Sequence, residues 1–462
     1  MPVRRALWIV CLVATLHALF FIWYQSSDWF VSWSDQDGYR RLGEVLATTG
    51  KFTRFPDATP FVPEVIRTPA YPAFVAIIYK VFGVRQLPVA IAQMALFAVT
   101  CLLVFGIGRR LTLDRTAWLG ALLTALFPAI PYFVPLVLTE VWTMLWFTIT
   151  MWLAVSAVDD PRMRTFILLG VAGGVTALSR PVFVLFPLAL ATAGLVVLPF
   201  VRVDPRPTPW NWSAMMAAFA ITMLPWFTYN YLTLGSFTLS PAGGIGRGIW
   251  EGSWQAMWSG RLQDELTDVA DQVDDHATLD RRVEAVAARE GLPAAPMLEY
   301  VHQWKTIRRI WVEPTDANER ARARVAADRE YLRVGLDNIR RNSAGQLVKR
   351  LARGVFILWA GEIPIRYSDI NATPPLVIRT GWAIQAAIML AALYGLLIYA
   401  RTGRVAAAVL LATPIVYVTA VHFPLLKEAR QSLPAMPIVL LLAAIAIADI
   451  TSSRRRTSRT PA

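Results

Sequence analysis

Apolar stretches of membrane-spanning length recur along this chain, and they constrain its fold more than any other feature. The hydrocarbon core of a bilayer is about 30 Å thick, so a helix needs roughly 20 apolar residues to cross it. Lipid offers no hydrogen-bond partners, so backbone that stays within it forms helices or a closed barrel. Hydrophobic residues make up 56% of the sequence, and the mean hydropathy is +0.45. We therefore expect an all-α polytopic membrane protein of about ten transmembrane helices with extracytoplasmic helical loops.

Arginines at the ends of the predicted spans indicate the orientation. We expect spans at approximately these positions: 6–24, 87–108, 117–135, 139–157, 165–180, 181–201, 212–233, 375–400, 405–421 and 432–450. The arginines on one side of them are Arg4, Arg5, Arg109, Arg110, Arg115, Arg162, Arg164, Arg202, Arg206, Arg401, Arg404, Arg454, Arg455 and Arg456. The positive-inside rule makes that side cytoplasmic, with both termini on it, in an inner or plasma membrane. Topology thus accounts for the net charge of +13, and we expect no nucleic-acid partner.

Charge distribution divides the chain into regions. Residues 1–234 form an N-terminal transmembrane core, whose first extracytoplasmic loop (25–86) is expected to carry the chemistry. Its opening run after MPVRR resembles a signal peptide but lacks a clear cleavage site, so we expect it to remain as the first span. Residues 235–374 form an extracytoplasmic helical segment that ends in an amphipathic interfacial helix near 346–359. Residues 375–451 hold the C-terminal transmembrane helices, and 452–462 form a basic cytoplasmic tail.

Two aspartates stand where the chain leaves the first span, in SDQDGYRRLGEVLATTG. Asp35 and Asp37 open a predicted amphipathic helix, and an ionised carboxylate there can act as a general base or bind a cation. The plainer interpretation is that one of them caps the helix.

The segment RTPAYPAF, which contains Arg67 and Tyr71, precedes the second predicted span. Its two prolines predict a bent, non-helical approach to the membrane. A simple turn, with Arg67 reaching lipid phosphate, is the plainer interpretation.

Three charged residues lie at the extracytoplasmic ends of predicted spans: Glu140, Arg180 and Arg430. Charge at membrane depth is costly and indicates a functional site. Their signs suit a site that holds a phosphate with arginines, close to Asp35. The plainer interpretation is an interhelical ion pair between Glu140 and an arginine.

Residues 224–252, LPWFTYNYLTLGSFTLSPAGGIGRGIWEG, close the seventh predicted span. The clustered glycines indicate a close backbone approach. The spacing lacks the strand, helix and lysine of a phosphate-binding loop, so we do not expect a nucleotide site here.

Taken in order, these segments resemble the C-type glycosyltransferases, membrane enzymes of the protein mannosyltransferase and aminoarabinose transferase kind. The matching features are Asp35 four residues before Tyr39, RTPAYP, the Thr139–Glu140 pair, LSRP, PWxxxNYxxxGSFxxSxxGG and EARQSLPAMP. Similar proteins often have Arg where this chain has Tyr229, and Tyr-Arg where it has Gln431–Ser432. The resemblance covers nearly all of the chain except about 255–345.

The resemblance implies a GT-C fold and a hexosyl- or pentosyltransferase that uses a polyprenyl-phosphate sugar. Asp35 is then the expected catalytic base, with Asp37 second. The substrate-binding residues expected from it and from the charges above are Tyr39, Arg67, Tyr71, Glu140, Arg180, Asn230, Tyr231, Lys427 and Arg430. The acceptor is a hydroxyl on a glycan, lipid or protein. No cofactor is required, although a divalent cation can bind if Asp35 and Asp37 act as a pair.

Two other functions fit the same composition. A transporter or flippase for a lipid-linked glycan also has many spans and buried charge, but it commonly shows related halves and midplane charges. A catalytically inactive scaffold of an envelope glycan complex keeps the fold without the reaction. The sequence does not identify the sugar, the acceptor, the oligomeric state or the role of residues 255–345.

Overall fold

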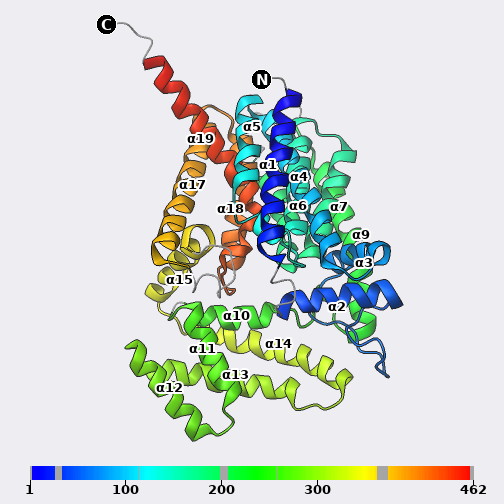
Figure 1. Cartoon of the computed structure of the whole chain (residues 1–462), viewed down its shortest axis with the longest axis vertical. Helices are drawn as coiled ribbons and strands as arrows, with labels where there is room; N and C mark the ends of the chain where they lie inside the picture. The colour runs from blue at the N-terminus through cyan, green and yellow to red at the C-terminus, as the bar shows by residue number, and fades with distance from the viewer. Residues whose placement is uncertain are drawn as a thin grey trace.

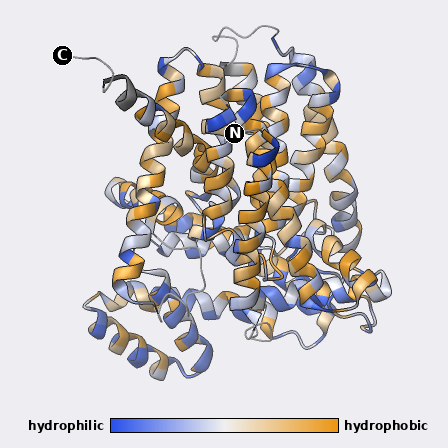
Figure 2. Cartoon of the chain, turned by 45° about the horizontal axis from the view of Figure 1, so that its top comes forward, coloured by the Kyte–Doolittle hydropathy of each residue, from blue (hydrophilic) through white to orange (hydrophobic). Residues whose placement is uncertain are grey.

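The computed structural model describes residues 3–26, 34–112, 114–197, 206–255, 257–361 and 373–457. Helices account for nearly all the regular structure in these ranges, and no β-strand occurs in them. The apolar helices run side by side in one bundle, and more polar helices gather beyond one end of it (Figures 1 and 2). The prediction of an all-α polytopic membrane protein is confirmed.

Six described helical segments are long and apolar enough to cross a membrane. They are α1 (Val3–Tyr24), α4 (Gln86–Leu111), α6 (Glu140–Asp159), α17 (Pro375–Arg401), α18 (Val405–His422) and the stretch Leu433–Ser452, most of which belongs to α19 (Met436–Thr457). Helix α6 and the stretch Leu433–Ser452 lie deepest in the bundle. In the most apolar part of each, 78% of the residues are buried inside the protein.

Five further described helices, all but α9 shorter than these, complete the bundle. They are α3 (Ala70–Phe82), α5 (Asp114–Leu126), α7 (Met163–Ser179), α8 (Phe186–Thr192) and α9 (Pro209–Leu234). Two predicted spans are therefore shorter or less regular than expected. The span at 117–135 ends as a helix at Leu126, and the one at 181–201 comprises a 3₁₀ turn, α8 and a π-turn to Val197, with 198–201 outside the described residues. Pro128, Pro131 and Pro135 follow the end of α5, and Pro181 follows the end of α7; proline favours a break at these places because it removes a helix hydrogen bond.

The segment 127–139 runs inside the bundle and is irregular apart from the 3₁₀ turn Pro131–Phe133, so many of its carbonyl groups need partners. Glutamine side chains from neighbouring helices supply them. Gln93 donates to the carbonyls of Val134 and Leu136 at 2.8 and 2.7 Å, and Gln86 donates to Pro135 at 2.7 Å. This irregular segment ends at Glu140, so the glutamines also hold that carboxylate in place.

The segment RTPAYPAF is more helical than predicted. Helix α3 begins at Ala70, directly after Pro69, and contains Pro72 in its first turn. A proline in the first turn costs little because the amide it lacks would have no intrahelical partner there. The expectation of a non-helical approach is therefore wrong from residue 70 onward, and Tyr71 is carried by a helix.

Beyond the bundle lie α2 (Ser34–Thr49), α10 (Ile245–Trp254), α11 (Gly260–Gln272), α12 (His276–Glu290), α13 (Ala294–Val312), α14 (Ala317–Arg340) and α15 (Ala344–Phe356). We call α11 to α14 the insertion. Its core is aromatic: Trp250 of α10 stacks on Tyr300 of α13 with ring centroids 4.8 Å apart. Gly335 lets α14 approach α10 closely, since a Cβ there would lie 2.7 Å from the Trp250 amide nitrogen.

The start of α1, the end of α19 and several basic residues lie at the opposite end of the bundle (Figure 1). At helix ends, Arg109 pairs with Asp114 at 2.9 Å and Arg110 with Asp159 at 3.4 Å. The Tyr399 hydroxyl donates to the Leu111 carbonyl at 3.0 Å, joining α17 to α4. These contacts gather the ends that the arginine pattern assigns to one side.

Candidate active site

Asp35 lies in the first turn of α2 and faces two arginines from distant parts of the chain. Its carboxylate oxygens are 3.7 Å from Nη2 of Arg67 and 3.6 Å from Nη2 of Arg430. Arg67 Nη2 also donates to the Asp35 backbone carbonyl at 3.3 Å. The Asp35 side chain is 52% exposed while that of Arg67 is 8% exposed, so the carboxylate is accessible and held from its buried side.

Glu140, at the start of α6, adds a second carboxylate to this group of charges. Its Oε1 lies 3.4 Å from Arg180 and 3.9 Å from Arg430. Its other oxygen, Oε2, and the Nη1 of Arg180 are buried without a hydrogen-bond partner among the described residues. Buried polar groups normally have partners. The two unpaired atoms therefore mark a place where a ligand or water can bind.

Arg430 joins the two carboxylates. It forms ion pairs with Asp35 and Glu140 at the distances given above, and its Nε donates a hydrogen bond to Glu428. Glu428 contributes most to raising the pKa of Arg430 above its ordinary value, opposed by burial, so the guanidinium stays charged. Reasoning from the sequence missed Glu428, although it lies only two residues from Arg430 in the motif EARQSLPAMP.

Glu64 positions Arg67 from behind. It is buried, and its Oε1 accepts hydrogen bonds from the amides of Ile66 and Arg67 at 2.9 and 3.3 Å. Its Oε2 pairs with Arg54 at 2.7 Å. A carboxylate that bonds the backbone of a functional arginine sets the direction of its side chain. The sequence analysis missed Glu64, for which the only signal is an acidic residue three positions before Arg67.

Aromatic side chains lie beside the Arg67 guanidinium. The guanidinium carbon lies 4.9 Å from the ring centroid of Tyr39, and Tyr39 meets Tyr71 edge to face at 5.2 Å. The Tyr71 hydroxyl lies 3.2 Å from Gln93 Oε1. Burial raises the pKa of Tyr39 to about 12, against the opposing effect of Arg67, so its hydroxyl is neutral at physiological pH.

Gln36, between the two aspartates, fixes α2 to the bundle. It is 2% exposed, and its Oε1 accepts a hydrogen bond from the Val137 amide at 2.8 Å. Val137 lies three residues before Glu140 in the irregular segment. This bond therefore connects the helix that carries Asp35 to the segment that carries Glu140.

Comparison with protein families gives a match over part of the chain. A family model described as dolichyl-phosphate-mannose-protein mannosyltransferase matches residues 66–227. That range contains Arg67, Tyr71, Glu140 and Arg180, but neither Asp35 nor Arg430. A search of curated protein sequences finds no match.

Solved structures with the same arrangement of helices cover nearly the whole chain. The apo oligosaccharyltransferase of Archaeoglobus fulgidus matches with a TM-score of 0.54 at 14% identity, over 98% of this chain and 51% of that one. The archaeal oligosaccharyltransferase AglB in complex with an inhibitory peptide and a dolichol-phosphate matches with a TM-score of 0.54 at 14% identity, over 97% and 50%. This chain thus spans about half the length of the archaeal enzyme. The chain has the GT-C fold.

The resemblance to C-type glycosyltransferases predicted from the sequence is confirmed by these findings. Within this GT-C fold, five charged residues come from five separate places: the start of α2, the segment before α3, the start of α6, the end of α7 and the turn before α19. We call Asp35, Arg67, Glu140, Arg180 and Arg430 the charged cluster.

Asn230 and Tyr231 have surroundings different from those of the charged cluster. The Asn230 side-chain amide donates to the carbonyls of Thr238 and Leu239 at 2.7 and 3.3 Å, folding the chain after α9 back onto that helix. Trp226 also donates to Leu239, at 2.6 Å. Tyr231 is 59% exposed. The motif PWxxxNYxxxGSF thus builds a turn in this GT-C fold.

Lys427 lies three residues before Arg430 in the sequence but has other cations, Arg350 and Arg353, as its charged neighbours. It is 3% exposed, and its Nζ donates to the Leu425 carbonyl at 3.1 Å. Burial, followed by the charges of Arg350 and Arg353, lowers its pKa to about 7. Its backbone amide bonds to Gln255 at 2.9 Å, which anchors the loop before α19 to the end of α10.

Asp35 and Asp37 do not fit a divalent cation as a pair. Successive residues in an α-helix are about 100° apart, so positions two apart point about 200° apart around it. Asp37 lies 3.8 Å from Arg40 on its own helix, whereas Asp35 faces two guanidinium groups that would repel a cation. In the described ranges no group of three metal-ligating residues occurs. One archaeal oligosaccharyltransferase structure is a complex with Zn and sulfate, and this pair of aspartates offers no corresponding chelate.

Proposed function

We propose that this protein is an inverting glycosyltransferase that moves a sugar from a polyprenyl-phosphate donor to a hydroxyl acceptor. We place the reaction at the end of the bundle that carries α2, on the extracytoplasmic side of an inner or plasma membrane. The observation that carries the proposal is the charged cluster, in which an accessible carboxylate is surrounded by arginines brought together from distant parts of a GT-C fold.

Asp35 supplies the general base. It accepts the proton of the acceptor hydroxyl as that oxygen forms its bond to the anomeric carbon. The bond between the anomeric carbon and the phosphate oxygen breaks in the same displacement, and the electron pair leaves with the lipid phosphate. A single displacement inverts the anomeric configuration. Phosphate is a good leaving group, so a second carboxyl group is not needed to protonate it.

Arginines stabilise the departing phosphate. Arg430 is exposed enough to reach a ligand, since 26% of its side chain is accessible, and Arg180 carries a buried Nη1 with no partner in the described part of the chain. Guanidinium groups bind phosphate oxygens through short charge-assisted hydrogen bonds. Glu140 pairs with Nη2 of Arg180, which leaves Nη1 of Arg180 for the donor.

The solved structures support a lipid-phosphate donor without identifying it. The archaeal enzyme has been solved with a dolichol-phosphate and with a tethered acceptor peptide. By analogy of fold, we propose a polyprenyl phosphate for this chain, and an acceptor hydroxyl on a glycan, lipid or protein.

The test is sugar transfer by the purified protein in lipid nanodiscs. Labelled sugars on a panel of polyprenyl phosphates are offered with envelope extract as acceptor. We expect Asp35→Asn to lose transfer by at least about 100-fold, because general-base catalysis contributes that much. Asp37→Asn is the matched control, since it makes the same change two residues away on the same helix, and should stay within a few fold of wild type.

Equal losses in the two variants would contradict the assignment of Asp35 as the base. An absence of transfer by the wild-type protein from every donor would contradict the enzyme proposal and favour a flippase or a scaffold. The assay is repeated with a chelator, and we expect unchanged transfer because the aspartates do not form a chelating pair. Loss that added Mg²⁺ restores would show a cation site built from other ligands.

A further inference from the structure

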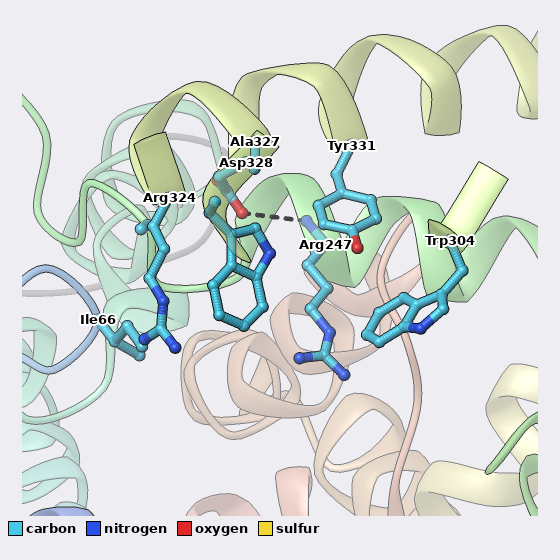
Figure 3. A pocket seen from close by; sticks show the side chains of 9 residues that line it. Ile66, Arg247, Trp304, Arg324, Ala327, Asp328 and Tyr331 are labelled. Carbon is cyan, nitrogen blue, oxygen red and sulfur yellow. Dashed lines mark hydrogen bonds between the residues drawn. The ribbon is translucent and has the colours of Figure 1, made fainter. Parts of the chain in front are cut away.

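A cavity of about 130 Å³ opens between the insertion and the segment that precedes α3 (Figure 3). Arg247 of α10, Trp304 of α13 and Arg324 and Tyr331 of α14 line it, together with Trp311 and Ile66. Liquid water occupies about 30 Å³ per molecule, so this volume suits one small polar group and part of a sugar ring rather than a whole oligosaccharide.

Both arginines of this cavity lie against tryptophan rings. The guanidinium carbon of Arg324 is 4.3 Å from the ring centroid of Trp311, and that of Arg247 is 5.0 Å from Trp304. A guanidinium beside an aromatic ring keeps N–H groups available for an oxyanion. In Figure 3 the two arginine side chains extend in the same direction.

The two arginines differ in how their charge is compensated. Arg247 pairs with Glu251 through its Nε at 2.7 Å. Asp328, the other carboxylate of the cavity, accepts from the amides of Gly246 and Arg247 at 3.2 Å each and so caps α10. The two carboxylates are thus engaged by the Arg247 side chain and by the start of α10, and the Arg324 guanidinium has no ion-pair partner among the described residues.

The electrostatics of Arg324 agree with this geometry. Its pKa is lowered, chiefly by burial and then by the neighbouring Arg54. A partly buried cation that neighbouring cations disfavour gains most from an incoming anion. The aromatic rings beside it offer apolar faces to a sugar ring.

We propose that this cavity binds an oxyanion, a carboxylate or a phosphate, carried by a sugar of the acceptor. That this sugar belongs to the acceptor rests on the proposed function. The binding of an acidic sugar in the cavity does not depend on it. Position supports the role: Ile66 lines the cavity, and the next residue, Arg67, holds Asp35. An acidic sugar anchored here lies next to the segment that orients the candidate base.

Saturation-transfer difference NMR on the full-length protein in nanodiscs tests binding without any donor. The probes are D-glucuronate, D-glucose 6-phosphate and, as the neutral match, D-glucose. We expect at least one charged probe to bind at least about tenfold more tightly than glucose, as charge-assisted hydrogen bonds require. The stronger of the two charged probes distinguishes a carboxylate from a phosphate ligand.

Arg324→Gln should weaken binding of that probe at least about tenfold, and Arg324→Lys should restore part of it. Arg329→Gln is the matched control, because Arg329 lies on the same helix with an exposed side chain. Equal binding of all three sugars, or unchanged binding by Arg324→Gln, would overturn the proposal.

Transfer kinetics separate this proposal from the proposed function. If transfer occurs, Arg324→Gln should raise the KM for an acidic acceptor at least about tenfold with kcat nearly unchanged. If the wild-type protein transfers no sugar, the NMR result still decides whether the cavity binds an acidic sugar. An unchanged acceptor KM together with loss of transfer in Asp35→Asn would reject the cavity as an acceptor site and keep the enzyme.

Discussion

Lys427 shows how strongly burial can change the pKa of a side chain. Its ammonium group is almost inaccessible and has two arginines as charged neighbours, so its pKa falls from 10.5 to about 7. The unfolded chain binds the proton more tightly between these two values. The free energy of unfolding therefore rises with pH from about 7 to about 10.5 through this group, and its full cost is present below pH 7.

Replacing Lys427 by methionine tests this linkage. We expect Lys427→Met to raise the unfolding temperature relative to wild type at pH 6, because it removes a buried cation, and the difference to shrink toward pH 9. Thermal unfolding in detergent across this pH range measures it. Lys349→Met, on the exposed face of α15, serves as the control and should show no such trend. A pH-independent difference for Lys427→Met would contradict the shifted pKa.

At the scale of elements, the approach of α2 to the segment before α3 depends on one missing side chain. Gly38 lies one turn after Asp35, and a Cβ there would be 2.2 Å from the Arg67 guanidinium carbon. Since Arg67 is buried and bonds to Asp35, it has little room to move away. Gly38 thus permits the contact between α2 and the segment before α3. The orientation of the Asp35 carboxylate depends on this contact.

Gly38→Ala should therefore displace Arg67 and lower sugar transfer by about tenfold to 100-fold, as small misplacements of catalytic groups do. The nanodisc transfer assay measures the effect. Gly345→Ala is the matched helical control, because a Cβ there meets only Ser343 Oγ, at 3.9 Å. Full activity in Gly38→Ala would show that Arg67 has no part in positioning Asp35.

At the scale of the whole molecule, the start of α1 and the end of α19 lie at one end of the apolar bundle and the insertion at the other (Figure 1). We propose that the end with the insertion is extracytoplasmic, since the arginine pattern places the other end in the cytoplasm. Both the charged cluster and the acidic-sugar cavity then face the same compartment.

Cysteine labelling tests this orientation. In a background of Cys11→Ser and Cys101→Ser, an impermeant maleimide applied to intact cells should label Glu284→Cys on α12. It should label Thr402→Cys, between α17 and α18, only after the membrane is permeabilised. Both positions are exposed. The reverse pattern would place the insertion in the cytoplasm and contradict the proposed side of the reaction.

Local features of the sequence were sufficient to predict much of the fold. Apolar length predicts α1, α4, α6 and α17 closely, because a bilayer sets the length of a spanning helix. Charged helical spacing predicts the insertion as solvated helices. Prolines were the source of two kinds of wrong prediction. Two predicted spans are broken near prolines, whereas Pro72, which was expected to prevent a helix, lies in the first turn of α3.

The charged cluster required more than local information. The sequence indicated charged candidates at the ends of spans, but Glu64 and Glu428, which hold Arg67 and Arg430, carry no distinctive spacing. The buried Gln36 and Gln93 do not stand out in the sequence either, because the backbone groups that they bond belong to an irregular segment far along the chain.

The sequence by itself therefore determined the class of the protein, its membrane helices and the residue types available for chemistry, since these follow from hydropathy and local charge. Tertiary structure alone decided that Asp35 meets Arg67 and Arg430, and that Gln36 meets the backbone amide of Val137. The reason is physical: burial and ion pairing depend on which distant elements pack together, and no local pattern contains that information.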